Sequence, residues 1–264
     1  MRESSGDDFT ALGDLAGGRL AVLVIAVGLL APRIGQPESY HHFADTRGWL
    51  GIPRFGDVVS NLPFAVIGVW GLSFLAGDVG RRAFVDPRER YAYVLVFFGL
   101  LLTAFGSGYY HMVPDNARLV WDRLPMTIVF MALVGAMIGE RISVRLELWL
   151  LPFLLLLGAG SVLQWYRSEL RGAGDLRLYA GVQLYALLVL LVALSLPPRY
   201  TRSSDLAVVA SFYVLAKVLE TGDRVVFSVG QLVSGHTLKH LAAAAAGYWI
   251  LRMLRKRTPI SLET

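Results

Sequence analysis

The stretch YAYVLVFFGLLLTAFGSGYYHMV, residues 91–113, decides the fold of this chain. It holds no Asp, Glu, Lys or Arg, and it is long enough for a membrane-spanning helix, which needs about 20 mostly apolar residues. Stretches of the same kind recur along the sequence. We predict an all-α integral membrane protein with eight spanning helices, at residues 19–34, 57–77, 91–113, 119–139, 147–165, 178–196, 205–221 and 236–254.

The composition indicates the same fold class. Of the 264 residues, 55% are hydrophobic and 17% are charged, whereas soluble domains carry about 25% charged residues. Such a chain is neither disordered, nor a nucleic-acid-binding domain, nor an ordinary soluble enzyme. Because cysteine is absent from the sequence, disulfides, thiolate-bound zinc, iron–sulfur clusters and a thiol nucleophile are excluded as well.

The predicted helices divide the chain into segments with different roles. Residues 1–18 form a polar tail, 19–34 an additional N-terminal transmembrane helix, 35–56 a non-cytoplasmic loop, 57–254 a seven-helix core and 255–264 a basic tail. The first helix is short enough to resemble a signal peptide. The residues before it are acidic rather than basic, however, so we predict a retained helix.

The basic residues predict the orientation. An even number of spans places both ends of the chain on one side, and 14 Lys and Arg lie on that side against nine on the other. Cytoplasmic loops carry an excess of Lys and Arg. We therefore predict that both termini are cytoplasmic. The compact loops and the absence of cysteine favour the inner membrane of a bacterium.

Three of the five histidines lie inside predicted helices, where ionisable groups are costly and usually face the interior of the bundle. His236 and His240 stand four residues apart at the start of the last helix, so both imidazoles lie on one face and could bind a single ion. Ser234 is the expected N-cap of that helix. His111 lies near the end of an earlier helix, with Ser107 one turn before it on the same face.

Asp122 follows His111 by eleven residues, beyond a Pro114-Asp115-Asn116 turn that should break the helix. His111 thus ends one helix and Asp122 begins the next on the same side of the membrane, where the last helix also starts. We therefore predict that the three histidines, Ser107 and Asp122 meet at one depth, toward the non-cytoplasmic side.

These residue types point to hydrolysis. Three histidines leave a tetrahedral zinc ion one open position for water, as in catalytic zinc sites, although imidazoles also suit copper, iron or nickel. Asp122 would act as the general base and then as the acid toward the leaving group. Ser107 would donate a hydrogen bond to the developing oxyanion or orient Asp122. The sequence therefore predicts a metal-dependent hydrolase for the amide or ester bond of a membrane lipid.

Weaker candidates surround this group. Ser60 and Asn61 could bond to the predicted base or to a helix end, or form polar contacts between helices. Lys239 lies beside the last two histidines and could extend to the membrane interface. The remaining histidines, His41 and His42, are expected to be plain loop residues.

Charged residues gather near the end of the helix 205–221. The spacings Lys217–Glu220 and Glu220–Arg224 predict a buried ion-pair network next to Asp223. Contact between this cluster and a substrate headgroup is the alternative.

Four motifs follow one another along the chain: DVVSNL (57–62), S-x-x-x-H (107–111), DRLPM (122–126) and H-x-x-x-H (236–240). In this order they resemble the alkaline ceramidase family, within the wider CREST group of membrane hydrolases. The resemblance covers roughly residues 40–255. It implies a CREST-type seven-helix core, a zinc ion on His111, His236 and His240, and hydrolysis of the N-acyl amide of ceramide to a fatty acid and a sphingoid base.

Two features depart from that family. The first predicted helix precedes the seven-helix core. In eukaryotic members an acidic, Trp-containing segment and a nearby Glu bind calcium, but here Arg54 stands just before the Ser-Asn motif, and Asp45, Trp49 and Asp57 do not reproduce the acidic pattern. We therefore assign no calcium. Because many bacteria make little ceramide, another N-acyl lipid is an alternative substrate.

Two other functions remain open from the sequence. A receptor-like or structural seven-helix protein could retain the metal without catalysis, and full coordination of the ion by protein atoms would favour it. A haem-binding electron carrier could use histidines on separate helices, but His236 and His240 lie on one face, too close to clasp a haem from both sides. The presence of Asp122 favours the hydrolase.

Overall fold

The computed structural model describes residues 30–260, which are mostly helical and contain no β-strand. The long helices in this range are α3 (Leu62–Ala76), α5 (Arg90–Met112), α6 (Asn116–Arg141), α7 (Val144–Leu170), α8 (Arg177–Ser195), α9 (Asp205–Thr221) and α11 (Gly235–Lys256). The short ones are α2 (Phe55–Val59), α4 (Asp78–Arg81), α10 (Asp223–Ser228) and the 3-10 helices η1 (Glu38–His41) and η2 (Pro87–Glu89). The all-α class is confirmed for this part of the chain.

The predicted helices between residues 57 and 254 each have a counterpart close to the expected position. The range 205–221 coincides with α9. The range 57–77 is covered by α2 and α3 together, which are separated at Ser60 and Asn61. Pro63 explains the break, because it has no N–H to bond to residue 59 and its ring would collide with that carbonyl group.

Parts of the prediction lie outside the described residues. These are the polar tail 1–18, residues 19–29 of the additional helix 19–34, and the last four residues of the basic tail 255–264. Of residues 30–34, which the structure describes, only Leu30 is helical, so the predicted end of this helix at residue 34 is four residues too late. The additional N-terminal helix therefore stays a prediction.

Five helices of the described residues are long and apolar enough to cross a membrane: Phe55–Ala76, Pro87–Met112, Asn116–Arg141, Val144–Leu170 and Arg177–Ser195. They indicate a multi-pass membrane protein. α9 is shorter, with 17 residues, and α11 carries histidines and a lysine in its first turns. That α9 and α11 also cross, and that both termini are cytoplasmic, stay predictions.

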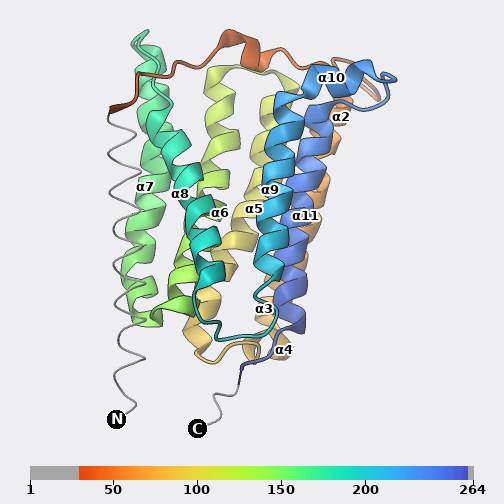
Figure 1. Cartoon of the computed structure of the whole chain (residues 1–264). Helices are drawn as coiled ribbons and strands as arrows, with labels where there is room; N and C mark the ends of the chain where they lie inside the picture. Colours follow the sequence, from red (N-terminus) through yellow and green to blue (C-terminus); the bar gives the residue numbers. More distant parts are fainter. Residues whose placement is uncertain (1–29, 261–264) are drawn as a thin grey trace, which may run out of the picture.

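Six of the long helices close into a ring around the middle of the molecule. The neighbours in contact are α3 and α5, α5 and α6, α6 and α8, α8 and α9, α9 and α11, and α11 and α3. α7 lies outside this ring, against α6 and α8 (Figure 1). The interior of the ring is therefore bounded by every long helix of the described residues except α7.

A glycine on α5 sets the distance between α5 and α6. A Cβ atom on Gly106 would lie 2.0 Å from the carbonyl oxygen of Trp121, so the two backbones can approach this closely only without a side chain. Ser107 and Asp122 each follow these residues by one position. The close approach therefore brings their side chains within hydrogen-bonding distance.

The two ends of the bundle differ in character. Loop 35–56 runs across the end where α5 finishes and where α6 and α11 begin (Figure 1). A buried ion pair lies at the opposite end, where the Arg257 guanidinium, 1% exposed, bonds to Glu140. Glu140 also accepts a 2.8 Å hydrogen bond from the Tyr93 hydroxyl, and the Tyr200 ring centre lies 3.9 Å from the guanidinium. These contacts hold the end of α11 against α5 and α6.

Candidate metal centre and cavity

The imidazoles of His111, His236 and His240 converge at the end of the ring that loop 35–56 covers. The three residues are 0%, 3% and 4% exposed. The Nε2 atoms of His111 and His236 are 3.3 Å apart, and one nitrogen from each of the three rings lies within 4.8 Å of the others. This buried group can hold a metal ion.

The spacing of two of these nitrogens suits an ion of the size of zinc. Two nitrogens that each lie about 2.05 Å from a tetrahedral ion are about 3.3 Å apart, and the Nε2 atoms of His111 and His236 have this separation. The Nδ1 atom of His111 is buried and has no hydrogen-bond partner within the described range. The Nε2 atom of His111, which faces that of His236, is the candidate ligand atom, for zinc as well as for copper, iron or nickel.

Ser60, at the break between α2 and α3, orients His240. Its Oγ atom lies 2.8 Å from Nδ1 of His240 and 3.2 Å from the carbonyl oxygen of Asp57. Because the hydroxyl donates its only proton to that carbonyl, it accepts the N–H of His240 at Nδ1. This tautomer leaves the Nε2 lone pair of His240 free to bind an ion. Ser60 thus contacts a candidate metal ligand, whereas the Asn61 amide donates only to the backbone of α2.

The start of α11 is built from local capping contacts. Ser234 is confirmed as the N-cap, because its Oγ accepts the backbone N–H of Thr237 at 3.0 Å. Asp223 accepts the backbone N–H groups of His236 and Ala44, both at 2.8 Å. Asp223 therefore ties the first turn of α11, which carries the histidines, to loop 35–56.

Loop 35–56 covers the histidines with Phe43. The Phe43 ring is 7% exposed, and its centroid lies 4.4 Å from that of His236 and 4.8 Å from that of His111. Sequence reasoning missed this residue, because one aromatic side chain in a mostly polar loop carries no helical periodicity. Its only signal is that it is apolar among polar neighbours.

His41 is a structural contact of the same loop rather than the plain loop residue expected. Its Nδ1 lies 2.8 Å from the Tyr110 hydroxyl and its Nε2 lies 3.0 Å from Oδ1 of Asn116. Since an amide oxygen only accepts, His41 donates from Nε2 and accepts from the tyrosine. Burial lowers the pKa of His41 and so favours this neutral form.

Arg47 joins loop 35–56 to the segment before α11. Its guanidinium bonds to the two carboxylate oxygens of Asp45 at 2.8 and 2.7 Å, and to the carbonyl oxygens of Gln231 and Leu232 at 2.7 and 2.9 Å. The guanidinium holds the pKa of Asp45 below its ordinary value of 3.8. The Arg47 side chain thus fixes loop 35–56, which covers the site, to the segment before α11.

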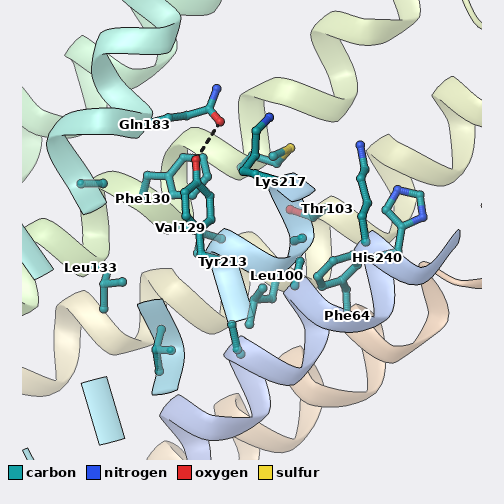
Figure 2. A pocket seen from close by; sticks show the side chains of 18 of the residues that line it. Phe64, Leu100, Thr103, Val129, Phe130, Leu133, Gln183, Tyr213, Lys217 and His240 are labelled. Atoms are coloured by element: carbon teal, nitrogen blue, oxygen red, sulfur yellow. Dashed lines mark hydrogen bonds between the residues drawn. The ribbon is translucent and has the colours of Figure 1, made fainter. Parts of the chain in front are cut away.

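A cavity of about 160 Å³ extends from His240 into the ring (Figure 2). Its polar end includes His240, Asp122 and Ser107, and the Ser107 hydroxyl donates to Asp122. The apolar walls further along include Phe64, Leu100, Val129 and Leu133. A cavity needs only roughly 10–15 Å³ to hold one water, so this one has room for part of a larger molecule. The sequence-predicted base and its serine therefore lie in one cavity with a predicted ligand.

An ionic cluster also lines the polar end. The two carboxylate oxygens of Glu220 bond to different ammonium groups, Oε2 to Lys217 and Oε1 to Lys239, the latter at 2.7 Å. Tyr40 of loop 35–56 donates its hydroxyl to Oε1 at 3.2 Å. The predicted Lys217–Glu220 pair is confirmed, but it is not fully buried as expected, because the Lys217 side chain is 52% exposed. Lys239 belongs to the same cluster instead of extending away from it.

The predicted Glu220–Arg224 pair is wrong. α9 ends at Thr221, and the chain turns at Gly222 before α10 begins, so the helical four-residue spacing is not kept. Arg224 instead donates to the carbonyl oxygen of His42 at 3.4 Å.

Comparisons with known proteins leave the family open. No protein-family model matches the chain, and no curated protein matches it significantly. The resemblance to alkaline ceramidases therefore stays a proposal that the order of the four motifs supports.

Proposed function

We propose that this protein is a zinc-dependent membrane amidohydrolase that cleaves the N-acyl amide bond of ceramide or a related N-acyl lipid into a fatty acid and an amine. The observation that carries the proposal is that Asp122 and His240, a member of the histidine group, both line the polar end of a cavity whose other walls are mostly apolar. Apolar cavities with a few polar groups are typical of ligand sites. An acyl chain in this cavity would place its carbonyl group beside Asp122 and His240.

His111, His236 and His240 would hold the ion. When bound, zinc supplies a Lewis acid that polarises a carbonyl group and makes water acidic enough to react near pH 7. Ser60 keeps His240 in the tautomer that binds through Nε2. Phe43 covers two of the rings and excludes water from the side away from the cavity.

Asp122 is the general base of the proposed reaction. Its carboxylate lines the cavity and interacts with the Ser107 hydroxyl, and a carboxylate has further lone pairs that can accept a proton from the attacking water. The same carboxyl group then returns that proton to the leaving amine. With the predicted orientation, this reaction would take place toward the non-cytoplasmic side of the membrane.

Metal content and lipid hydrolysis together test the proposal. The full chain would be purified in mild detergent and assayed for fatty-acid release from N-acyl lipids, beside His240→Ala, Asp122→Asn and the control Leu156→Ala on the exposed face of α7. We expect near-stoichiometric zinc in all but His240→Ala. Activity should be lost in His240→Ala and fall at least about a hundredfold in Asp122→Asn, because general-base catalysis contributes that much.

Two results would overturn this proposal. A folded protein that binds no zinc even after the metal is added back would remove the metal centre. A zinc-loaded protein that hydrolyses no N-acyl lipid would favour the receptor-like or structural function.

A further inference from the structure

We propose that the amine side of the substrate carries an anionic group, a carboxylate, sulfonate or phosphate, which Lys217 and Lys239 bind in the cavity. The inference rests on the proposed function and narrows its substrate class. It starts from two ammonium groups in the cavity wall that share a single carboxylate, that of Glu220.

Both lysines have hydrogen-bond donors to spare. An ammonium group has three N–H donors, and within the described range each lysine gives one of them to Glu220. Glu220 in turn receives three donors, since Tyr40 also bonds to it. These three donors occupy most of the roughly four acceptor sites of the carboxylate, and the remaining ammonium donors are available to oxygen atoms of a ligand in the cavity.

The charge at the polar end favours an anion. The two positive charges of the lysines balance the negative charges of Glu220 and of ionised Asp122, so the net charge of these four cavity-lining side chains is zero. A divalent ion on the neighbouring histidines would add two positive charges and make the net charge at this end of the cavity positive. Solvent screens such an excess weakly at Lys239, whose side chain is 15% exposed, and more strongly at Lys217, which is 52% exposed. A cationic headgroup would be repelled there, and an anionic one would be stabilised.

The position of Lys217 matches the amine side of the scissile bond. On α9 the cavity-lining residues Val209, Tyr213 and Lys217 follow at four-residue intervals, so one helix face runs from the apolar walls to the polar end. In the view of Figure 2, Lys217 and His240 both lie above Leu100, toward that end. With the acyl chain along the apolar walls and its carbonyl at His240, the rest of the substrate reaches the lysines.

A matched pair of lipids tests this inference. N-palmitoylglycine and N-palmitoylethanolamine have nearly the same shape, but the first ends in a carboxylate and the second in a neutral hydroxymethyl group. N-palmitoyltaurine is a second anionic lipid, which ends in a sulfonate. Palmitate release would be measured as kcat and KM with the full-length, zinc-loaded protein, for the wild type, Lys217→Gln and Lys217→Arg. Lys256→Gln, an exposed lysine at the other end of α11, is the charge-matched control. Zinc content would report that each variant is folded.

We expect the wild type to prefer the two anionic lipids by about tenfold or more in kcat/KM, as a charge-assisted hydrogen bond allows. Lys217→Gln should remove this preference, mainly by raising KM for the two anionic lipids. Lys217→Arg should restore most of the preference, and Lys256→Gln should keep it.

Different failures have different meanings. The inference is overturned if the wild type hydrolyses the neutral lipid with a kcat/KM equal to or greater than that for the anionic lipids. It is also overturned if Lys217→Gln lowers kcat/KM equally for all three lipids. Both outcomes leave the proposed function intact. If Lys217→Gln is inhibited less strongly by palmitate but keeps the lipid preference, the lysines bind the fatty-acid product rather than the substrate. This outcome also overturns the inference. Zinc-loaded protein that hydrolyses none of the three lipids removes the proposed function itself.

Discussion

Ser60 gives a residue-scale test of the metal centre that leaves the histidines in place. Replacement by alanine removes the acceptor for the Nδ1–H of His240 and frees that ring to rotate or change tautomer. We expect Ser60→Ala to lower zinc affinity roughly ten- to a hundredfold, the usual effect of losing such a partner. Competition with a chelator of known affinity measures it. Ser60→Thr keeps the hydroxyl and should keep the zinc affinity of the wild type. A Ser60→Ala protein that binds zinc as tightly as the wild type would contradict the role of Ser60 in fixing the tautomer of His240.

At the same scale, some site residues were predictable and others were not. The sequence predicts the three histidines of the site because ionisable side chains are rare in apolar helices and because helical periodicity predicts which residues share a face. These are His111, His236 and His240. The bond between Ser60 and His240 depends on how the break between α2 and α3 packs against α11, which no local pattern encodes. Phe43 was missed for the related reason that loops have no period.

At the scale of elements, the contact between α5 and α6 depends on Gly106. A Cβ atom there would collide with the carbonyl oxygen of Trp121, a backbone atom that cannot move aside alone. We expect Gly106→Ala to destabilise the protein by about 1–3 kcal/mol and to weaken hydrolysis, since Ser107 and Asp122 would separate. Thermal unfolding in detergent measures the first effect.

Gly108 on the same helix is the matched control. A Cβ atom at Gly108 would meet nothing within 4 Å, and alanine is the better helix former. Gly108→Ala should therefore leave the unfolding temperature unchanged or slightly raised. Equal destabilisation by the two substitutions would show that the close contact at Gly106 is not what holds α5 against α6.

The clamp between Arg47 and Asp45 predicts a pH dependence of loop 35–56. The pKa of Asp45 lies below its ordinary value of 3.8 in the folded protein, so the ion pair stabilises the loop above pH 3.8 and this stabilisation is lost only as the pH falls from 3.8 through the lower pKa of the folded state. We expect limited proteolysis of the loop to be equally slow at pH 7 and pH 5. Arg47→Ala should be cleaved faster at both pH values, while the exposed Arg81→Ala at the other end should behave as wild type.

The helices themselves were predictable, and their arrangement was not. Long apolar stretches mark α5 to α8 in the sequence, and the turn residues at Pro114 separate two of them correctly. Nothing in the composition of α7 distinguishes it from α6 or α8, yet of the long helices that the structure describes α7 is the one outside the ring. Its place depends on which faces pack together, a property of the whole bundle rather than of one segment.

On the scale of the whole molecule, the buried pair of Arg257 and Glu140 fastens the end opposite the metal centre. Arg257→Ala leaves the Glu140 carboxylate buried with only the Tyr93 hydroxyl as a partner. Breaking a buried pair in this way costs about 3–5 kcal/mol, so we expect a clear fall in the unfolding temperature of the full chain. Zinc binding at 25 °C should persist. The exposed neighbour Lys256→Ala is the control, and an Arg257→Ala protein as stable as this control would refute the role of the pair.

The depth of the cavity has a consequence for the supply of substrate. His240 and Ile250 of α11 both line it, and ten residues of α-helix rise about 15 Å. This is half of the roughly 30 Å hydrocarbon thickness of a bilayer. A lipid could therefore place its acyl chain in the ring without passing the bilayer midplane. If the protein hydrolyses lipids as proposed, it would draw on a single leaflet, the one beside loop 35–56, and lipids of the other leaflet would have to flip across before they could be cleaved.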